Sequence, residues 1–292
     1  MAVAEPFIAI GPRRPFAPLV KARRVARDSR KVDLLLAGGL LVVTAFAVLA
    51  PLVDSSNPLT VAGQPFVPPF HAGALLGTDD VGRDVFSRVL YGIRTSWFSA
   101  WIVIASGVVI GGTIGLVAGA CGGFVDTILM RFTDAMLALP GPIVAIAVVA
   151  SLGPSLSNTI IAIVVVWWPF YARIVRGEIR ALSVRPHLEA ARLAGVGPVR
   201  RALRHLLPGA LPAVVVTASL DVANLLITLS ALSFLGLGSP QPAPELGAMA
   251  AQNLQYLLQD WWLSVMPALA IFLLAFIANF SGDAVRNLMG RS

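Results

Sequence analysis

Long apolar stretches without a single charged residue constrain this chain more than any other feature. Residues 34–53, 95–125 and 135–172 contain no Asp, Glu, Lys or Arg. About 20 apolar residues suffice for a helix to cross the hydrocarbon of a bilayer. With a mean hydropathy of +0.81 and only 13% charged residues, the chain is too apolar for a water-soluble domain. We therefore expect an all-α, polytopic membrane protein.

The apolar stretches predict about six transmembrane helices. The expected spans are 34–53, about 97–119, two helices within 135–172, 207–235 and 261–282. A turn at 151–158 separates the two helices of the long stretch, which exceeds the length of one span. Four prolines are expected to kink spans three, four and six, namely Pro140, Pro142, Pro169 and Pro267.

The distribution of Lys and Arg predicts the orientation of these spans, because positive loops resist translocation. Eight basic residues lie in an N-terminal arm, residues 1–33, and six arginines lie in the loop 178–208. The turn 151–158 and the connection 236–260 have none, and the connection 54–94 has three arginines against four aspartates. We expect the arm, the basic loop and both chain ends in the cytoplasm, with the other three segments outside. The arm lacks a signal-peptide pattern, so span one is expected to target the chain.

Span two contains regularly spaced glycines, so one face of the expected helix has no side chains. The glycines recur at every fourth position, at Gly107, Gly111, Gly115, Gly119 and Gly123. Small residues at this spacing allow another membrane helix to approach closely. We expect packing within the chain, with a subunit interface as the alternative.

Several kinds of chemistry are excluded by residues that the sequence lacks. The only lysines are Lys21 and Lys31, so no GxxxxGK[ST] phosphate-binding loop exists. The three histidines are too far apart for an HExxH zinc site, and no serine lies in a G-x-S-x-G elbow. We expect no enzymatic activity, no metal and no cofactor. If ATP drives this protein, a separate subunit binds it. The net charge of +7 reflects positive loops rather than a nucleic-acid surface.

The basic loop 178–208 contains two short helical stretches joined around Gly195, which permits the positive φ that ends a helix. Its alanines form a smooth surface and its arginines can pair with acids of a partner. A solvated positive loop is the alternative. The order Glu189, two alanines, Gly195 and Pro208 resembles the EAA signature of ABC importer permeases. That family usually has an aliphatic residue where His205 stands, whereas its peptide branch commonly has His.

In that family, this loop docks into a cleft of the ATPase subunit and couples ATP hydrolysis to transport. The resemblance and the basic residues give these candidate coupling positions: Glu189, Ala190, Ala191, Arg192, Gly195, Arg200, Arg201, Arg204 and Pro208.

The external connection carries a second motif in residues 76–92, which resembles the C-type subunit of dipeptide, oligopeptide and nickel permeases. The candidate residues here are Gly77, Thr78, Asp79, Gly82, Arg83 and Asp84. From the residues alone, Thr78 or Asp79 can cap a helix, and Arg83 can pair with Asp79 or Asp80. Contact with a substrate-delivering binding protein is the alternative.

Residues 231–238, together with the end of the chain at 261–287, give a third match. The resemblance therefore extends from about residue 30 to the C-terminus. Many relatives have an acidic residue just before this run, where this chain has Leu229. Asp221 lies two turns earlier, with Asn224 one turn on. A carboxylate at the bilayer centre costs about 2.5–3.5 kcal/mol on insertion scales. Asp221 and Asn224 are therefore candidate residues of a translocation pathway, with simple pairing inside the bundle as the alternative.

The resemblance implies a permease domain at 34–292 in a bacterial inner membrane. The implied partners are a homologous second permease, two ATPase subunits and an extracytoplasmic binding protein, and the implied cargo is short peptides. Nickel or haem import is the alternative within the family. A secondary transporter without ATPase partners, or a membrane scaffold, is the alternative outside it.

Overall fold

The computed structural model describes residues 19–54, 56–71 and 73–290, with the backbone alone for 19–30. The first 18 residues of the predicted N-terminal arm lie outside the described residues. Within the described part the fold is helical, and β pairing is limited to isolated bridges. The main helices are α1 Leu19–Val53, α2 Val85–Cys121, α3 Gly123–Ala138, α4 Gly141–Leu152, α5 Leu156–Ser183, α6 Pro186–Leu193, α7 Pro198–Arg201, α8 Leu207–Phe234, α9 Leu246–Gln252 and α10 Trp262–Met289. A π-helical turn, Ala202–Leu206, joins α7 to α8, and a 3₁₀ turn, Leu254–Tyr256, follows α9.

The prediction of about six spans is confirmed, although one of them is broken. Helices α1, α2, α5, α8 and α10 are long and apolar enough to cross a membrane. Helices α3 and α4 are long and apolar enough to cross a membrane only when they are taken together, and they meet at an angle of 87°. Five unbroken helices and one broken helix pair therefore account for the apolar stretches.

The predicted third span, in the first part of 135–172, starts too late, whereas the kink expected at Pro140 is present as a break in the helix. The third crossing begins earlier, at Gly123, and breaks between Ala138 and Gly141. Pro140 restricts the residue before it to extended backbone, and Leu139 indeed has φ −84° and ψ 138°. By contrast, α5 and α10 continue through Pro169 and Pro267.

Helix α2 is the long central element of the molecule. Its 37 residues extend about 55 Å, well beyond the roughly 30 Å of hydrocarbon that a span must cross. It begins 12 residues before the predicted start at 97 and so includes the last part of the predicted connection 54–94. It packs against α1, α5, α8 and α10.

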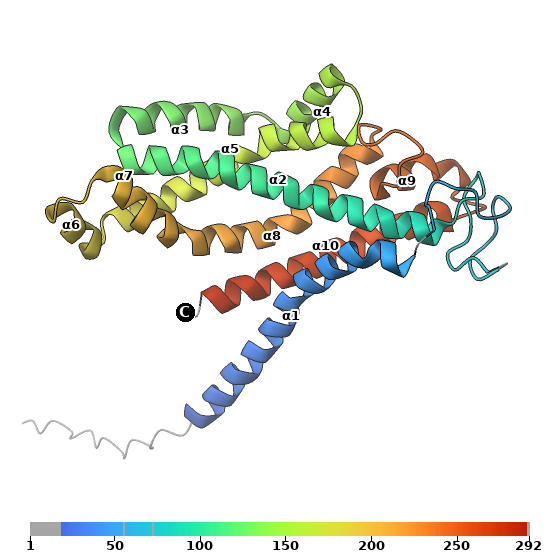
Figure 1. Ribbon diagram of the computed structural model, residues 1–292, viewed down its shortest axis with the longest axis horizontal. Coiled ribbons are helices and arrows are strands. Elements are labelled where there is room, and N and C mark those ends of the chain that lie inside the picture. Colours follow the sequence, from blue (N-terminus) through green and yellow to red (C-terminus); the bar gives the residue numbers. More distant parts are fainter. Residues whose placement is uncertain (1–18, 55, 72, 291–292) are drawn as a thin grey trace, which may run out of the picture.

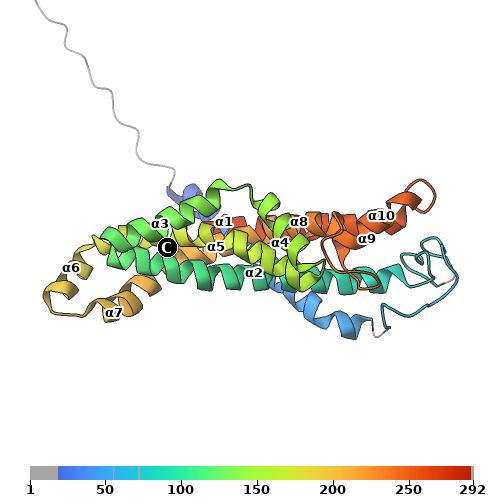
Figure 2. The same cartoon turned by 90° about the horizontal axis from the view of Figure 1, so that it is seen from above.

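The loops gather at two opposite ends of an elongated molecule (Figure 1). Helices α6 and α7 form one end, and the segment 54–84 lies with α9 at the other. A view turned by 90° shows the same separation (Figure 2). The loop 178–208 thus lies opposite the connections 54–94 and 236–260, and their cytoplasmic and external placement stays a prediction.

Four of the five regularly spaced glycines face α5, and their lack of a side chain allows the two helices to pack closely. A Cβ on Gly107 would lie 3.0 Å from the Tyr171 ring, and one on Gly119 would lie 2.8 Å from Ile179 Cβ. At Gly111 and Gly115 the added atom would meet the backbone of α5 itself. Gly123, which we expected on the same face, instead begins α3 with a positive φ and open space around it.

This close approach predicts that Gly111→Ala destabilises the protein and that Gly112→Ala does not. A Cβ at 111 would lie 2.8 Å from the Ala172 nitrogen, and backbone cannot move aside cheaply. A Cβ at 112 meets only Val175, at 4.0 Å. Thermal unfolding of the detergent-solubilised variants, followed by size-exclusion chromatography, measures the difference. Equal melting temperatures for the two variants would contradict this account of the α2–α5 contact.

Candidate functional site

The loop between α5 and α8 forms a structured projection at one end of the molecule. Helix α6 ends in a Schellman motif, in which Gly195 N–H donates to the Arg192 carbonyl and Val196 N–H to the Ala191 carbonyl. Gly195 has φ +77°, as expected for the residue that closes this motif. The chain then turns into α7, which begins at Pro198.

Two buried leucines anchor this projection, while other apolar side chains on it remain exposed. Leu188 and Leu206 are buried in a cluster with residues of α5 and α8. Leu193 is 85% exposed and Val199 is 70% exposed. Apolar side chains held out on a structured end of a molecule are typical of a surface that a partner covers.

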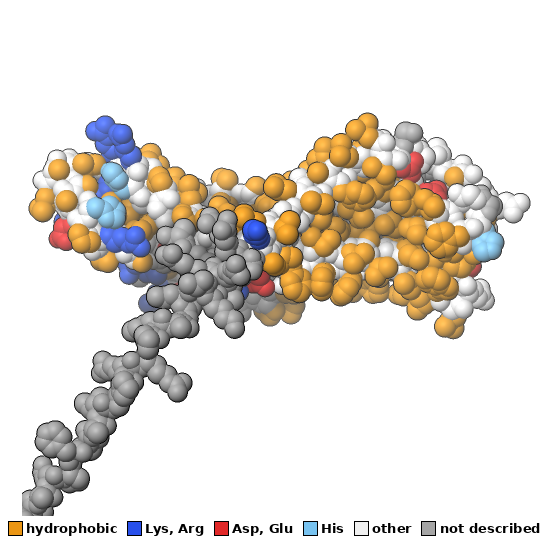
Figure 3. Space-filling model, turned by 90° about the horizontal axis from the view of Figure 1, so that it is seen from below, with side chains coloured by type: hydrophobic (Ala, Val, Ile, Leu, Met, Phe, Trp, Pro, Cys, Tyr) orange, Lys and Arg blue, Asp and Glu red, His pale blue; other side chains and the backbone are white. Residues whose placement is uncertain are grey.

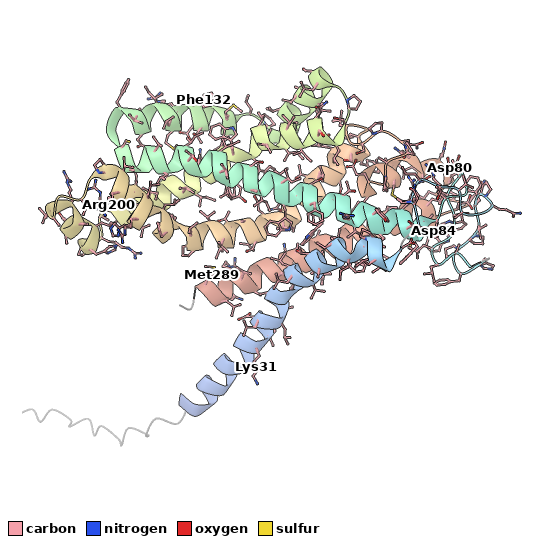
Figure 4. All side chains as sticks on the ribbon, in the orientation of Figure 1. Lys31, Asp80, Asp84, Phe132, Arg200 and Met289 are labelled. Carbon is pink, nitrogen blue, oxygen red and sulfur yellow. The ribbon has the colours of Figure 1, made fainter. Side chains whose placement is uncertain are left out.

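The predicted coupling residues come together on this projection. Glu189, Ala190, Ala191 and Arg192 lie on α6, Arg200 and Arg201 on α7, Arg204 in the π-helical turn and Pro208 in the first turn of α8. Arg200 marks this end of the molecule, and basic side chains gather there (Figures 3 and 4). Glu189, Arg192 and Arg201 also line a cavity of about 360 Å³ beside Cys121 at the end of α2.

A second candidate region lies deep within the spans, around Asp221. This residue occupies the middle of α8, and its side chain is buried. Its Oδ2 accepts hydrogen bonds from Trp167 Nε1 and from Tyr171 Oη, the latter at 3.1 Å. Asn224, the other predicted pathway residue, is exposed one turn away, and both line a cavity of about 480 Å³.

The two aromatic partners of Asp221 were missed by the sequence reasoning. Trp167 and Tyr171 are four residues apart and therefore lie on one face of α5. Two polar aromatic side chains on one face of a membrane helix are a signal that they share an acceptor on a neighbouring helix.

The external segment is built around a buried ion cluster, as the pairing hypothesis predicted. Asp79 Oδ2 lies 2.6 Å from Arg83 Nε and 3.5 Å from Arg88 Nε. Its Oδ1 accepts hydrogen bonds from the backbone N–H groups of Val81 and Arg83. Arg88 Nη1 in turn donates to carbonyls of Pro58 and Pro242, so it ties the connections 54–94 and 236–260 together.

The predicted helix cap in this segment is wrong. Neither Thr78 nor Asp79 caps α2. Instead, Asp84 Oδ2 accepts a hydrogen bond from Ser87 N–H at 2.7 Å. Thr78 Oγ1 accepts from Val67 N–H and donates to the Gln64 carbonyl, which closes the preceding loop. Gly77 and Gly82 both have positive φ in turns of this segment, and Asp84 lies with Asp80 at this end of the molecule (Figure 4).

A buried acid in the connection 236–260, Glu245, was also missed. Its carboxylate accepts hydrogen bonds from Ser233 Oγ and from Ser239 N–H. A Cβ on Gly238 would collide with Glu245 and Ser233, so the glycine-rich turn after α8 wraps closely around this carboxylate.

Comparison with known proteins identifies the family. Residues 111–291, which include the α5–α8 projection and Asp221, match the family described as "binding-protein-dependent transport system inner membrane component". The chain belongs to this family. It is an ABC importer permease, a multi-pass protein of the bacterial inner membrane.

The similar permeases include several whose names refer to peptides. The probable D,D-dipeptide transport system permease protein DdpC of Escherichia coli K12 is 36% identical over 86% of this chain and 84% of its own length. A putative peptide transport system permease protein of Brucella suis is 38% identical over 93% and 90%. The dipeptide transport system permease protein DppC of Alkalihalophilus pseudofirmus is 35% identical over 86% and 84%.

The permease fold also resembles a solved structure. The inward-facing MetNI methionine ABC transporter contains a chain that matches this permease with a TM-score of 0.57. The match covers 70% of this chain and 97% of that chain, at 20% identity. At this identity the likeness concerns the fold alone.

Proposed function

We propose that this permease carries short peptides, which an extracytoplasmic binding protein delivers, across the inner membrane. A homologous second permease completes the pathway, and two separate ATPase subunits supply the energy. The observation that carries this proposal is the fixed projection of α6 and α7, which displays the EAA residues of an importer permease together with uncovered apolar side chains.

The projection is suited to transmit movement. Its Schellman turn and its buried anchors, Leu188 and Leu206, make α6 and α7 move with the ends of α5 and α8. Closure of an ATPase pair against Leu193 and Val199 would therefore displace both spans. Arg200 and Arg204, which are exposed, supply positive charge for acidic groups on the ATPase surface.

The broken third crossing is suited to line a pathway. Non-helical backbone at membrane depth is tolerated only where protein buries it or where it lines a cavity. Leu139 and Gly141 flank the break, and both line the cavity that contains Asp221. Spans α3/α4, α5 and α8 thus face the proposed path.

Peptides are the proposed cargo because the names of the relatives refer to peptides or dipeptides, and because the second motif, residues 76–92, and His205 fit that branch. Nickel or haem import remains the second candidate of the same family. A secondary transporter is disfavoured by the family membership.

Uptake in the native bacterium tests the cargo. Deletion of this chain is expected to abolish uptake of radiolabelled dialanine, and a plasmid copy is expected to restore it. Uptake of ⁶³Ni²⁺ and growth on haem as sole iron source serve as parallel readouts. Unchanged dialanine uptake together with loss of nickel or haem uptake would replace the peptide proposal with its alternative.

A further inference from the structure

The cavity around Asp221 combines features that recognise a positively charged group. It has a volume of about 480 Å³, within the range of small-molecule sites. It is lined by Asp221, Asn224 and Thr228 and by the aromatic residues Trp167 and Phe170.

Asp221 has hydrogen-bond donors but no counter-charge. Trp167 and Tyr171, which both donate to its Oδ2, are neutral. In the part of the chain that the structure describes, every ion pair within 4.0 Å involves another acid: Asp79, Asp80, Asp126, Asp134 or Asp283. A carboxylate in the middle of a span is costly, and membrane carboxylates are typically paired. The two donors fix the position of the carboxylate without neutralising it.

The other walls of the cavity suit a ligand whose side chains vary. Met136, Leu137 and Ile227 provide apolar surface, and methionine adapts its shape readily. Trp167 and Phe170 add aromatic faces, which attract cations. One fixed negative charge within adaptable apolar walls matches a peptide, which has one constant ammonium group and changing side chains.

We propose that this cavity binds the positively charged amino terminus of the transported peptide, with the Asp221 carboxylate as its counter-charge. The inference rests on the proposed function, since it assumes peptide cargo. It assigns the amino terminus to the middle of the membrane, where α5, α8 and the break between α3 and α4 meet.

A single reporter cysteine tests the charge preference of the cavity. Cys121 is the only cysteine of the chain, so a Cys121→Ser background accepts one new thiol. Asn224→Cys places that thiol in the cavity, and Ser151→Cys places a control thiol at the exposed end of α4. The complex is purified from its native membrane and labelled with a cationic or an anionic methanethiosulfonate reagent, namely the trimethylammonium-ethyl or the sulfonatoethyl form.

We expect the cationic reagent to label the cavity thiol faster than the anionic one. Asp221→Asn should lower this ratio by about tenfold, and the control thiol should show no change. Millimolar dialanine should slow labelling of the cavity thiol, whereas N-acetyl-dialanine, which lacks the ammonium, should not. A ratio unaffected by Asp221→Asn, or equal protection by both peptides, would overturn the inference.

The outcomes separate this inference from the proposed function. If the complex still transports dialanine but the ratio of cationic to anionic labelling is unchanged by Asp221→Asn, the assignment of Asp221 fails and the proposed function stands. If no ATPase subunit accompanies the chain, yet the ratio and the protection behave as expected, the cation site stands and the proposed function fails.

Discussion

Replacing Asp79 by Asn is expected to lower the stability of the external segment by about 3–5 kcal/mol, which is the usual cost of leaving buried charges unpaired. The side chains of Asp79, Arg83 and Arg88 are only 6%, 9% and 4% exposed. The substitution preserves shape but removes the negative charge between two buried guanidinium groups. Unfolding in mixed detergent micelles measures the free energy, and limited proteolysis of residues 54–84 shows where the loss occurs.

Asp80 provides a matched control on the same turn. Its carboxylate lies 3.8 Å from Arg83, and its side chain is 35% exposed. Solvent-exposed pairs contribute little, so Asp80→Asn should change stability by less than about 1 kcal/mol. If the two variants lost equal stability, the central role of Asp79 in this cluster would be contradicted.

The largest expected effect on function comes from charging the apolar tip of the α6–α7 projection. The double variant Leu193→Asp and Val199→Asp should reduce ATP-driven dialanine uptake in proteoliposomes by more than tenfold. Both side chains point away from the permease core, at 85% and 70% exposed, so the fold should tolerate the change. Two buried charges in an apolar interface would instead weaken ATPase binding.

The control for this variant lies at the opposite end of the molecule. Leu258 is 99% exposed beyond α9, and Leu258→Asp should leave ATPase binding unchanged. The melting temperature of the double variant should match that of the wild type. Undiminished uptake by a correctly folded double variant would show that the tip of the projection does not couple to an ATPase.

Local sequence determined which features could be predicted. The positive φ of Gly195 and the pairing of Asp79 with Arg83 involve residues close in the chain, so residue type and spacing indicate them. The glycine face of α2 could also be predicted, because helical periodicity alone places four of the glycines on the same side of the helix.

The features that were missed depend on residues far apart in the sequence. The segment after Gly123 contains charges and therefore resembles a loop. Asp126, however, lies 2.5 Å from Arg176 Nε on α5 and also pairs with Arg180. These pairs hold α3 against α5 across some 50 residues of chain. Hydropathy cannot report such a contact, so the third span was placed too late.

The most direct test of the account is purification of the tagged chain from its native membrane in mild detergent, with mass spectrometry of the co-purifying proteins. A Cβ at Gly195 would meet nothing within 4 Å, so Gly195→Trp has room within this chain but would obstruct a docked partner. Gly195→Ala incurs the same positive-φ penalty without the bulk.

We predict that wild type and Gly195→Ala co-purify with ATPase subunits and a second permease, and that Gly195→Trp loses the ATPase subunits. Recovery of the wild-type chain without any ATPase, or identical partners for all three proteins, would contradict the coupling role of the projection.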